Sequence, residues 1–287
     1  TRLTSCSRAT PQPPKKSNDG LSNRRRLAKV GLEDERGGTE YAEEKGMELI
    51  DGKDFGPSDW MAKYAVTFQN RTGGPRWYYW ESDCTGTIVG SHWILTAAHC
   101  GIGWDTRIRF HNGSGFSSDI DWPSRTPGSV VRPPGITQHK YVVNGVRMDL
   151  QLVRTTNEVD LTKYRSATIA SGLDGLDGYL QGSSKSSGST GQLQWVEGKV
   201  AAFNYLTNSF TVGRAWGSWP WPVPPRTNAN HGDSGGGFLR VQSWNGSEPK
   251  FSIIGVTNSV DGSNLEGPNM TNAGGMLRAW ITSIPST

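Results

Sequence analysis

The chain has 287 residues, which is enough for one large domain or two small ones. Its formal net charge is only +4. Of its 30 Lys and Arg and 26 Asp and Glu, residues 1–49 hold ten and eight, and the remainder holds twenty and eighteen. Neither part has the one-sided charge of a nucleic-acid binder, and no stretch approaches the roughly 20 apolar residues of a membrane span, so the composition argues against both classes.

Residues 1–49 differ in composition and residue pattern from the rest of the chain. They are charged, carry three closely spaced prolines, and show no sustained alternation of apolar and polar residues. We therefore treat residues 1–49 as a separate segment and residues 50–287 as the folded domain.

From about Tyr64 the chain changes to short apolar runs separated by Gly, Asn, Ser and Pro. Each run has the length of a strand, is rich in β-branched and aromatic residues, and is bounded by turn formers. Many short strands at such spacing predict an all-β sandwich or barrel. The runs are residues 64–68, 86–89, 93–96, 150–153 and 252–256.

Two later stretches predict loops, and the end of the chain predicts a helix. Residues 182–191 are almost wholly Gly and Ser, which is typical of a flexible surface loop. Residues 216–225 contain four prolines, which lack the amide donor that a central strand needs. The apolar residues at i, i+3, i+4 and i+7 that predict the helix are Leu277, Trp280, Ile281 and Ile284.

The first chemically informative segment runs from Cys84 to Cys100 and ends in Thr96-Ala-Ala-His99-Cys100. A strand pair that ends in a histidine holds the imidazole at one edge of the sheet. A disulfide between Cys84 and Cys100 would close this hairpin and hold His99 in place, and a loop of this size contributes roughly 3 kcal/mol in the chain-entropy picture.

The second segment is His231-Gly-Asp-Ser-Gly-Gly-Gly237. A serine among glycines allows a tight backbone turn and points amide groups at an incoming carbonyl. The N–H groups of Gly232 and Ser234 would then bind the oxyanion of a tetrahedral intermediate.

The third segment is Met148-Asp149-Leu-Gln-Leu-Val153, in which an aspartate precedes an alternating strand. A carboxylate buried there can accept the Nδ1–H of a histidine and select its tautomer. Asp160, in Val159-Asp160-Leu161, is the rival candidate. We prefer Asp149 because of the strand that follows it.

Together these segments resemble the chymotrypsin/trypsin family of serine proteases, whose motifs contain a histidine, an aspartate and a serine in this order. The resemblance covers residues 50–287. It implies two packed six-stranded antiparallel β-barrels with the site between them, and a C-terminal helix. It also implies that Ser234 is the nucleophile, His99 the general base and then acid, and Asp149 the orienting carboxylate.

The same resemblance suggests an activation mechanism. Family members begin at a short aliphatic segment whose free amine inserts beside the Asp before the catalytic Ser, and here these residues correspond to Ile50 and Asp233. Residues 1–49 are then a pro-segment of a zymogen. The residue before the cleavage point is Leu49, not the basic residue of many family zymogens. The alternative is that residues 1–49 are a disordered extension.

In this family the residue six positions before the catalytic Ser lies at the base of the primary substrate pocket, and here it is Asn228. No carboxylate stands there to favour Arg or Lys, and Thr257 replaces the His of Glu-specific relatives. Asn258 and Val260 occupy the wall of the pocket and depart from the family's Ser-Trp-Gly. We expect a neutral pocket, with His231 and the Pro-rich residues 216–225 bordering the cleft.

The chain has three cysteines, which leaves Cys6 odd if Cys84 and Cys100 pair. It begins with neither Met nor an apolar signal region, and we expect a secreted protein from which a signal segment has been removed. Four N-x-Ser/Thr sequons agree with secretion and glycosylation, at Asn70, Asn112, Asn245 and Asn269.

The acyl-transfer chemistry requires no cofactor, and His92, His111 and His139 show no metal-ligand spacing, so we expect no metal site. The expected partners are protein or peptide substrates and an activating protease, without nucleic acid or membrane, and the protein is expected to be a monomer. The alternative function is a catalytically inactive binding protein on the same fold, although the intact motifs argue against it.

Overall fold

The computed structural model describes residues 53–54, 60–74, 77–112, 116–170, 177–183, 193–204, 209–214, 233–261, 264–268, 279–281 and 283–284. All of them lie within residues 44–287, one of the two units into which the chain divides. The boundary expected at residues 49 and 50 falls outside these ranges. Within them, no helix has the length and apolar composition to cross a membrane.

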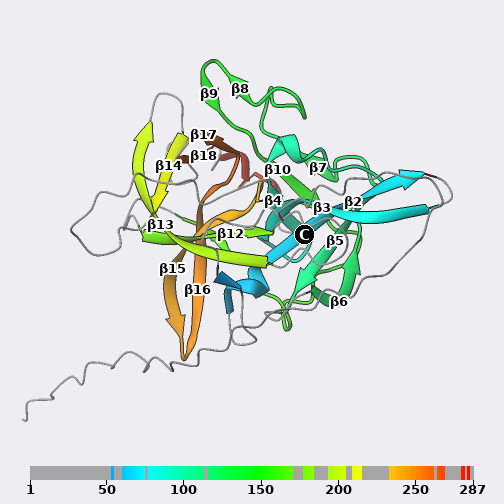
Figure 1. The fold of residues 1–287 in the computed structure, drawn as a ribbon, viewed down its shortest axis with the longest axis horizontal. Coiled ribbons are helices and arrows are strands. Elements are labelled where there is room, and N and C mark those ends of the chain that lie inside the picture. Colours follow the sequence, from blue (N-terminus) through cyan, green and yellow to red (C-terminus); the bar gives the residue numbers. More distant parts are fainter. Residues whose placement is uncertain are drawn as a thin grey trace, which may run out of the picture. The chain divides into compact units, whose positions relative to one another are not determined.

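One antiparallel sheet contains seven strands in the order β6-β5-β2-β3-β4-β10-β7 (Figure 1). The pairs β2–β3, β3–β4 and β5–β6 are consecutive along the chain, whereas β5 returns to pair with β2 and β10 returns to pair with β4 and β7. The strands are β2 (Ala65–Gly74), β3 (Trp77–Ile88), β4 (Trp93–Thr96), β5 (Thr106–His111), β6 (Phe116–Asp121), β7 (Val130–Val131) and β10 (Gln151–Arg154).

A second sheet of nine strands has the order β11-β16-β15-β12-β13-β14-β18-β17, with β1 also paired to β13. Its pairs are antiparallel apart from β11 with β16. The strands are β1 (Lys53–Asp54), β11 (Thr168–Ile169), β12 (Asp177–Ser183), β13 (Leu193–Asn204), β14 (Ser209–Arg214), β15 (Gly237–Asn245), β16 (Glu248–Val256), β17 (Ser259–Asp261) and β18 (Asn264–Pro268).

Two 3-10 helices, a hairpin and a helical turn complete the described fold. Two 3-10 helices, η1 (Trp60–Tyr64) and η2 (Ala98–Cys100), precede β2 and follow β4. A separate two-stranded hairpin pairs β8 (Val142–Val143) with β9 (Val146–Arg147). Residues 279–281 are helical, and the side chains of Trp280, Ile281 and Ile284 pack against the core, as the apolar stripe predicted.

The prediction of a mostly β fold is confirmed, and each predicted strand run overlaps a strand of the structure. The two sheets contain seven and nine strands among the described residues, not the six expected for each barrel, because short edge strands add to them. The prediction of a loop over residues 182–191 is wrong at its start, because β12 continues through Ser183. Gly182 and Ser183 pair with Gln194 and Leu193, so ladder hydrogen bonding outweighs the loop preference of Gly and Ser there. The remainder of that stretch, residues 216–225 and Leu277 lie outside the described residues.

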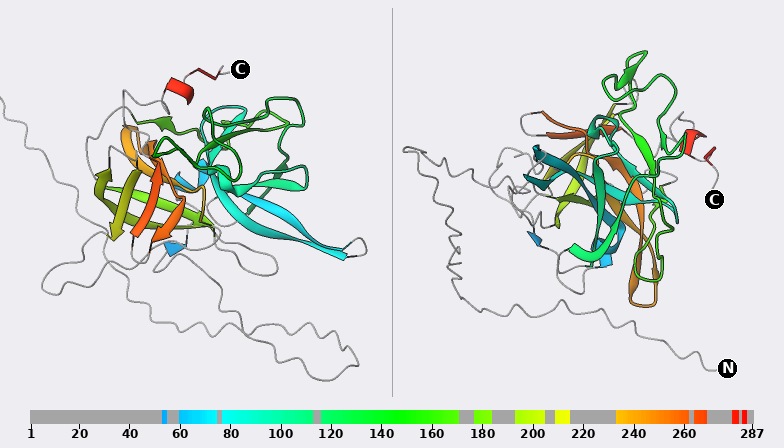
Figure 2. Two further views of the ribbon diagram at one scale, coloured as in Figure 1. Left: turned by 90° about the horizontal axis from the view of Figure 1, so that it is seen from above. Right: turned by 90° about the vertical axis from the view of Figure 1, so that its right-hand side faces the viewer.

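The inner halves of β2 and β3 are buried and their outer halves are exposed. In β2, residues 65–69 are all buried, whereas residues 70–74 alternate between half-buried and exposed. The buried half packs Val66 and Phe68 against Ile94 and Ile108, which are fully buried apolar side chains of β4 and β5. The outer half of the hairpin projects beyond the sheet, as the left panel of Figure 2 shows.

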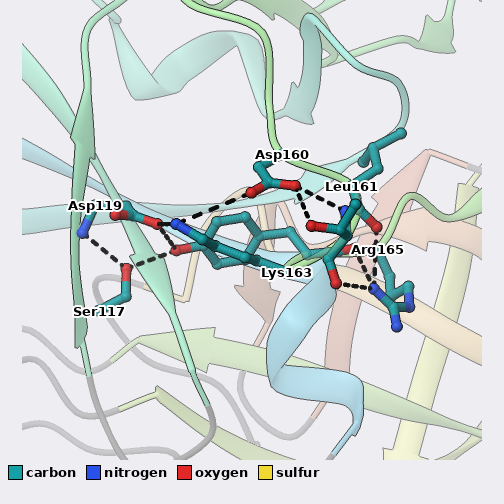
Figure 3. A network of polar contacts seen from close by, with 8 residues as sticks. Ser117, Asp119, Asp160, Leu161, Lys163 and Arg165 are labelled. Atoms are coloured by element: carbon teal, nitrogen blue, oxygen red, sulfur yellow. Dashed lines mark hydrogen bonds and ion pairs between the residues drawn. The ribbon is translucent and has the colours of Figure 1, made fainter.

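A polar network fastens the segment between the two sheets onto β6 (Figure 3). The Tyr164 hydroxyl donates to Asp119 Oδ2 at 2.8 Å and lies 2.8 Å from Ser117 Oγ. Lys163 Nζ lies 3.3 Å from the same Asp119 oxygen. The Tyr164 hydrogen bond is the main cause that lowers the pKa of Asp119, while burial raises the pKa of Tyr164.

Arg165 carries this connection to the second sheet. Its Nε donates to Glu248 Oε1 at 2.5 Å on β16. Its Nη1 donates to the carbonyl oxygens of Leu161, Thr162 and Tyr164 at 2.8–3.1 Å. The segment that joins the two sheets is therefore bonded to both, which fixes how they meet within this unit.

The burial of His111 predicts how the free energy of unfolding depends on pH. The ring is fully buried and hydrogen-bonded to Thr67 Oγ1 at 2.8 Å, and burial followed by the charge of Arg109 lowers its pKa from 6.5 to about 3. The folded state thus keeps His111 neutral while the unfolded state binds a proton below pH 6.5. The resulting stability is complete above pH 6.5 and is lost as the pH falls from 6.5 towards 3, by up to about 1.4 kcal/mol per pH unit.

Urea unfolding at pH 7 and pH 5 measures this effect. His111→Gln should show a smaller loss of unfolding free energy between the two pH values than the parent, by about 2 kcal/mol. His139→Gln, at an exposed histidine, is the matched control and should lose as much as the parent. Equal acid sensitivity of the parent and His111→Gln would show that His111 does not titrate in this way.

Candidate active site

His99 and Asp149 meet because β4 and β10 are paired. The register places Gln151 opposite Thr96, so the residues just before β10 lie beside η2, which follows β4. His99 Nδ1 lies 2.7 Å from Asp149 Oδ2, and the His99 backbone N–H donates to Asp149 Oδ1 at 3.0 Å. Both oxygens of this buried carboxylate therefore hold His99. A carboxylate on Nδ1 favours the tautomer in which Nε2 is free to accept a proton.

Two further residues support this pair, and the sequence did not indicate either of these contacts. The amide Nδ2 of Asn258 donates to the Asp149 carbonyl oxygen at 3.2 Å. The ring of Tyr141, which precedes β8, meets the His99 ring edge-on at 5.8 Å between centroids. Asn258 was predicted to line a substrate pocket; it is buried, and its described contact is with the backbone of Asp149.

The rival aspartate, Asp160, lies in the network of Figure 3 and not at His99. Its Oδ1 accepts from the Thr162 N–H at 2.9 Å, and these Thr162 hydrogen bonds lower the pKa of Asp160. Its Oδ2 lies 3.9 Å from Lys163 Nζ. Asp160 thus has a structural environment on the connecting segment.

Ser234 lies in a tight turn that begins β15 and is bonded to both sheets. The Thr85 N–H of β3 donates to the Ser234 carbonyl oxygen at 2.8 Å. The Gly235 N–H donates to the Thr257 carbonyl oxygen at 2.7 Å, and the Gly236 N–H to the Asp233 carbonyl oxygen at 3.0 Å. The turn is therefore held from β3 on one side and from the residue after β16 on the other.

Gly235 is required by this turn for two reasons. Its φ is +83°, in the left-handed region that side chains disfavour. A Cβ atom at this position would collide with the Thr96 hydroxyl and the Thr85 carbonyl oxygen. The close approach of the turn to β3 and β4 thus depends on glycine.

The predicted disulfide between Cys84 and Cys100 is confirmed. It joins β3 to η2 with 6.0 Å between the two Cα atoms. Cys100 Sγ lies 3.7 Å from the Ser234 carbonyl oxygen, so the bridge sits between the His99 segment and the Ser234 turn. Cys84, His99 and Cys100 place possible metal ligands within 4.8 Å of one another. Both sulfurs are consumed by the bridge and are not thiolates, so this cluster does not fit a metal ion.

The structure joins His99 to Asp149 directly and brings the Ser234 backbone alongside. Among the described residues, no hydrogen bond links the Ser234 hydroxyl to the His99 ring. Asp233 is fully buried beside Ser234. Val260 lies on β17 and pairs with Leu265. Ile50, Asn228, His231 and Gly232 fall outside the described residues.

Comparisons with known proteins agree with this arrangement. Human (Homo sapiens) chymotrypsin-like elastase family member 1 is 31% identical over 131 residues, which are 44% of this chain and 46% of that protein. The chain therefore spans about half the length of this curated relative. The solved structure of HBP at atomic resolution matches with a TM-score of 0.57 at 15% identity, over 82% of this chain and 96% of that chain, which shows a shared fold.

A family model described as Trypsin matches residues 50–281 of the chain, well over half of its length. With the disulfide and the His99–Asp149 pair in the positions that the motifs predicted, this match identifies the chain as a member of the trypsin family, with the chymotrypsin-like serine protease fold.

Proposed function

We propose that this chain is a secreted serine endopeptidase that cleaves peptide bonds through an acyl-enzyme. The observation that carries the proposal is the short His99–Asp149 hydrogen bond, with Ser234 held beside it by Thr85. The Ser234 carbonyl oxygen lies 3.7 Å from the sulfur of Cys100, the residue after His99, which supports a nucleophile and its base at one site.

In this mechanism Ser234 Oγ attacks the carbonyl carbon of the substrate and passes its proton to His99 Nε2. Asp149 stabilises the imidazolium through Nδ1–H, and the N–H groups of Gly232 and Ser234 bind the oxyanion. His99 then gives the proton to the leaving amine, and the C–N bond breaks. Water repeats the sequence on the acyl-enzyme, releasing the acid and restoring Ser234.

We further propose a neutral primary pocket and a zymogen switch. Asn228 at the base of the pocket offers no charge to a basic or acidic substrate side chain. The family resemblance implies that cleavage before Ile50 would supply a free amine to pair with Asp233, which is fully buried and precedes Ser234 in the chain. The two sheets would each close as a barrel, with the site between them.

Secretion and glycosylation form part of the same proposal. A disulfide is typical of proteins from oxidising compartments. Asn245 is exposed at the end of β15 and is open to a glycan. Asn70 is not, because its Nδ2 donates to Asp83 Oδ2 at 2.6 Å within the β2–β3 pair.

Labelling with a fluorescent serine-reactive phosphonate tests the function. The chain trimmed to begin at Ile50 should be labelled, and Ser234→Ala should abolish labelling, whereas Ser243→Ala at an exposed strand position should not alter it. Asp149→Asn should slow labelling by about 10⁴-fold because it favours the wrong tautomer of His99.

The untrimmed chain separates the two parts of the proposal. Labelling of the trimmed chain alone supports the zymogen switch, and equal labelling of both removes it. Absence of labelling in both folded chains would favour the inactive binding protein.

Gly235→Ala tests whether the turn must approach β3 and β4 so closely. The new methyl group collides with Thr96 and Thr85, and a displacement of about 1 Å at a nucleophile costs about 10²-fold in rate. Gly128→Ala is the matched control, since Gly128 has a similar φ of +81° but no atom near its Cβ position. If Gly235→Ala reacts with the phosphonate as fast as Gly128→Ala, the turn does not position Ser234.

A further inference from the structure

The outer half of the β2–β3 hairpin carries an unusual set of side chains on one face. This face, called the Trp–Arg face below, continues onto β5 and the end of β6, and the hairpin that bears it projects outward in Figure 2. Its members are Arg71, Tyr78, Trp80, Arg107 and Trp122.

Strand register brings these residues together. Arg71 pairs with Trp80, and Tyr78 lies two residues along the same strand, so the three share a face. On the other side of β2, Gln69 pairs with Arg107 of β5. Trp77 and Tyr79 alternate onto the opposite face of the hairpin, where their rings stack on each other.

On the Trp–Arg face, guanidinium groups alternate with aromatic rings. Arg71 lies 4.0 Å above the centre of the Tyr78 ring, and Arg107 lies 4.3 Å above the Trp80 ring. Tyr78 and Trp80 meet edge-on at 6.2 Å, and Trp80 meets Trp122 at 5.5 Å. These cation–π contacts order both guanidinium groups against the rings without neutralising their charge.

The two outer rings of this face are exposed, and Trp80 between them is half-buried. Tyr78 is 54% exposed and Trp122 41% exposed. Single exposed apolar residues are ordinary, but a contiguous exposed aromatic patch marks a contact surface. Aromatic residues and arginine are also the types that interface centres favour.

The positive charge of the face has no acidic partner. Among the described residues, no carboxylate lies within ion-pair distance of Arg71 or Arg107. Arg107 Nε donates to the neutral oxygen of Gln69 at 2.8 Å. Burial and then the nearby charge of Arg109 lower the pKa of Arg107 to about 10, so it stays protonated at neutral pH.

We propose that the Trp–Arg face binds an acidic peptide segment of a protein substrate or inhibitor. Carboxylates of the segment pair with Arg71 and Arg107, and its apolar side chains lie against Tyr78, Trp80 and Trp122. From the register, the two arginine Cα atoms are about 8 Å apart, one strand over and two residues along. That separation is comparable with the spacing of about 7 Å between residues i and i+2 of an extended peptide.

The charge distribution favours a short peptide over a long polyanion. Two guanidinium groups separated by rings suit individually placed carboxylates, whereas polyanions are bound by extended tracks of cations. The face carries only these two arginines among its five members, too few for such a track. The Trp–Arg face is thus selective for carboxylates set between apolar groups.

The face also lies on the strand that leads to the candidate active site. Trp80 precedes Cys84 by four residues, about 14 Å along β3, and Cys84 is bonded to the neighbour of His99. If one part of a polypeptide is bound to the Trp–Arg face, another part of the same polypeptide can reach the candidate active site. The nature of the partner rests on the proposed endopeptidase function, whereas the binding itself does not.

Calorimetric titration of the full chain carrying Ser234→Ala measures binding without cleavage. The probe is the peptide Glu-Leu-Glu-Leu-Glu, and Gln-Leu-Gln-Leu-Gln is its neutral counterpart. We expect binding of the acidic peptide alone, weakened by added salt. The double variant Arg71→Gln with Arg107→Gln should weaken binding of the acidic peptide at least about tenfold. Trp122→Ala should also weaken this binding, although it retains both arginines. Lys140→Gln with Lys250→Gln, which removes two charges from exposed lysines away from this face, should stay within about twofold.

Equal binding of the two peptides, or unchanged binding in the double variant, would overturn the proposal. A heparin-derived hexasaccharide that binds through Arg71 and Arg107 without competition from the acidic peptide would also overturn it, in favour of a polyanion site. Phosphonate labelling of the chain with Ser234 intact reports the catalytic function separately, so peptide binding without labelling would leave this surface in place on an inactive protein.

Discussion

A backbone hydrogen bond from the N–H of Thr85 to the carbonyl oxygen of Ser234 joins the two sheets at the site where the chemistry is expected. Thr85 belongs to β3 of the seven-stranded sheet, and Ser234 belongs to the turn that opens β15 of the other. Because Gly235 has no side chain, this turn can sit directly against Thr85 and Thr96. The position of Ser234 relative to His99 follows from this contact, since His99 is held to the first sheet by η2.

The disulfide and the His99–Asp149 pair depend on the same frame. Cys84 follows the outer hairpin on β3, and its bond to Cys100 holds η2 against the strand that also anchors Ser234. Asp149 reaches His99 because β10 pairs with β4, and Asn258 binds the backbone of Asp149 from just after β16. Contacts from both sheets therefore converge on one residue, Asp149. Arg165 adds a further tie between the sheets by bonding the connecting segment to β16.

The two halves of the β2–β3 hairpin have different roles. The inner half of the hairpin contributes to the buried core, whereas the outer half places aromatic rings and arginines in solvent. Cation–π contacts order these side chains without neutralising the charge of the arginines. Core packing and a contact surface thus occupy successive lengths of the same two strands.

The sequence by itself determined what depends on residues close together along the chain. The motifs around His99 and Ser234, the cysteine spacing and the alternating runs identified the all-β class and the family, because catalytic turns and strands carry local signatures. The alternating strand after Asp149 favoured it over Asp160, but the contact of Asp149 with His99 depends on the pairing of β10 with β4. The extension of β12 into Gly182 and Ser183 needed a partner strand to outweigh their loop preference.

Only the tertiary structure decided which distant side chains meet. Asn258 was assigned to a pocket wall from its position in the chain, yet its described hydrogen bond is to the Asp149 backbone. The contact of Tyr141 with His99 and the alternation of arginines and rings on the hairpin arise from strand register and loop placement. Register is set by long-range pairing and core burial, and no local pattern of residues encodes it.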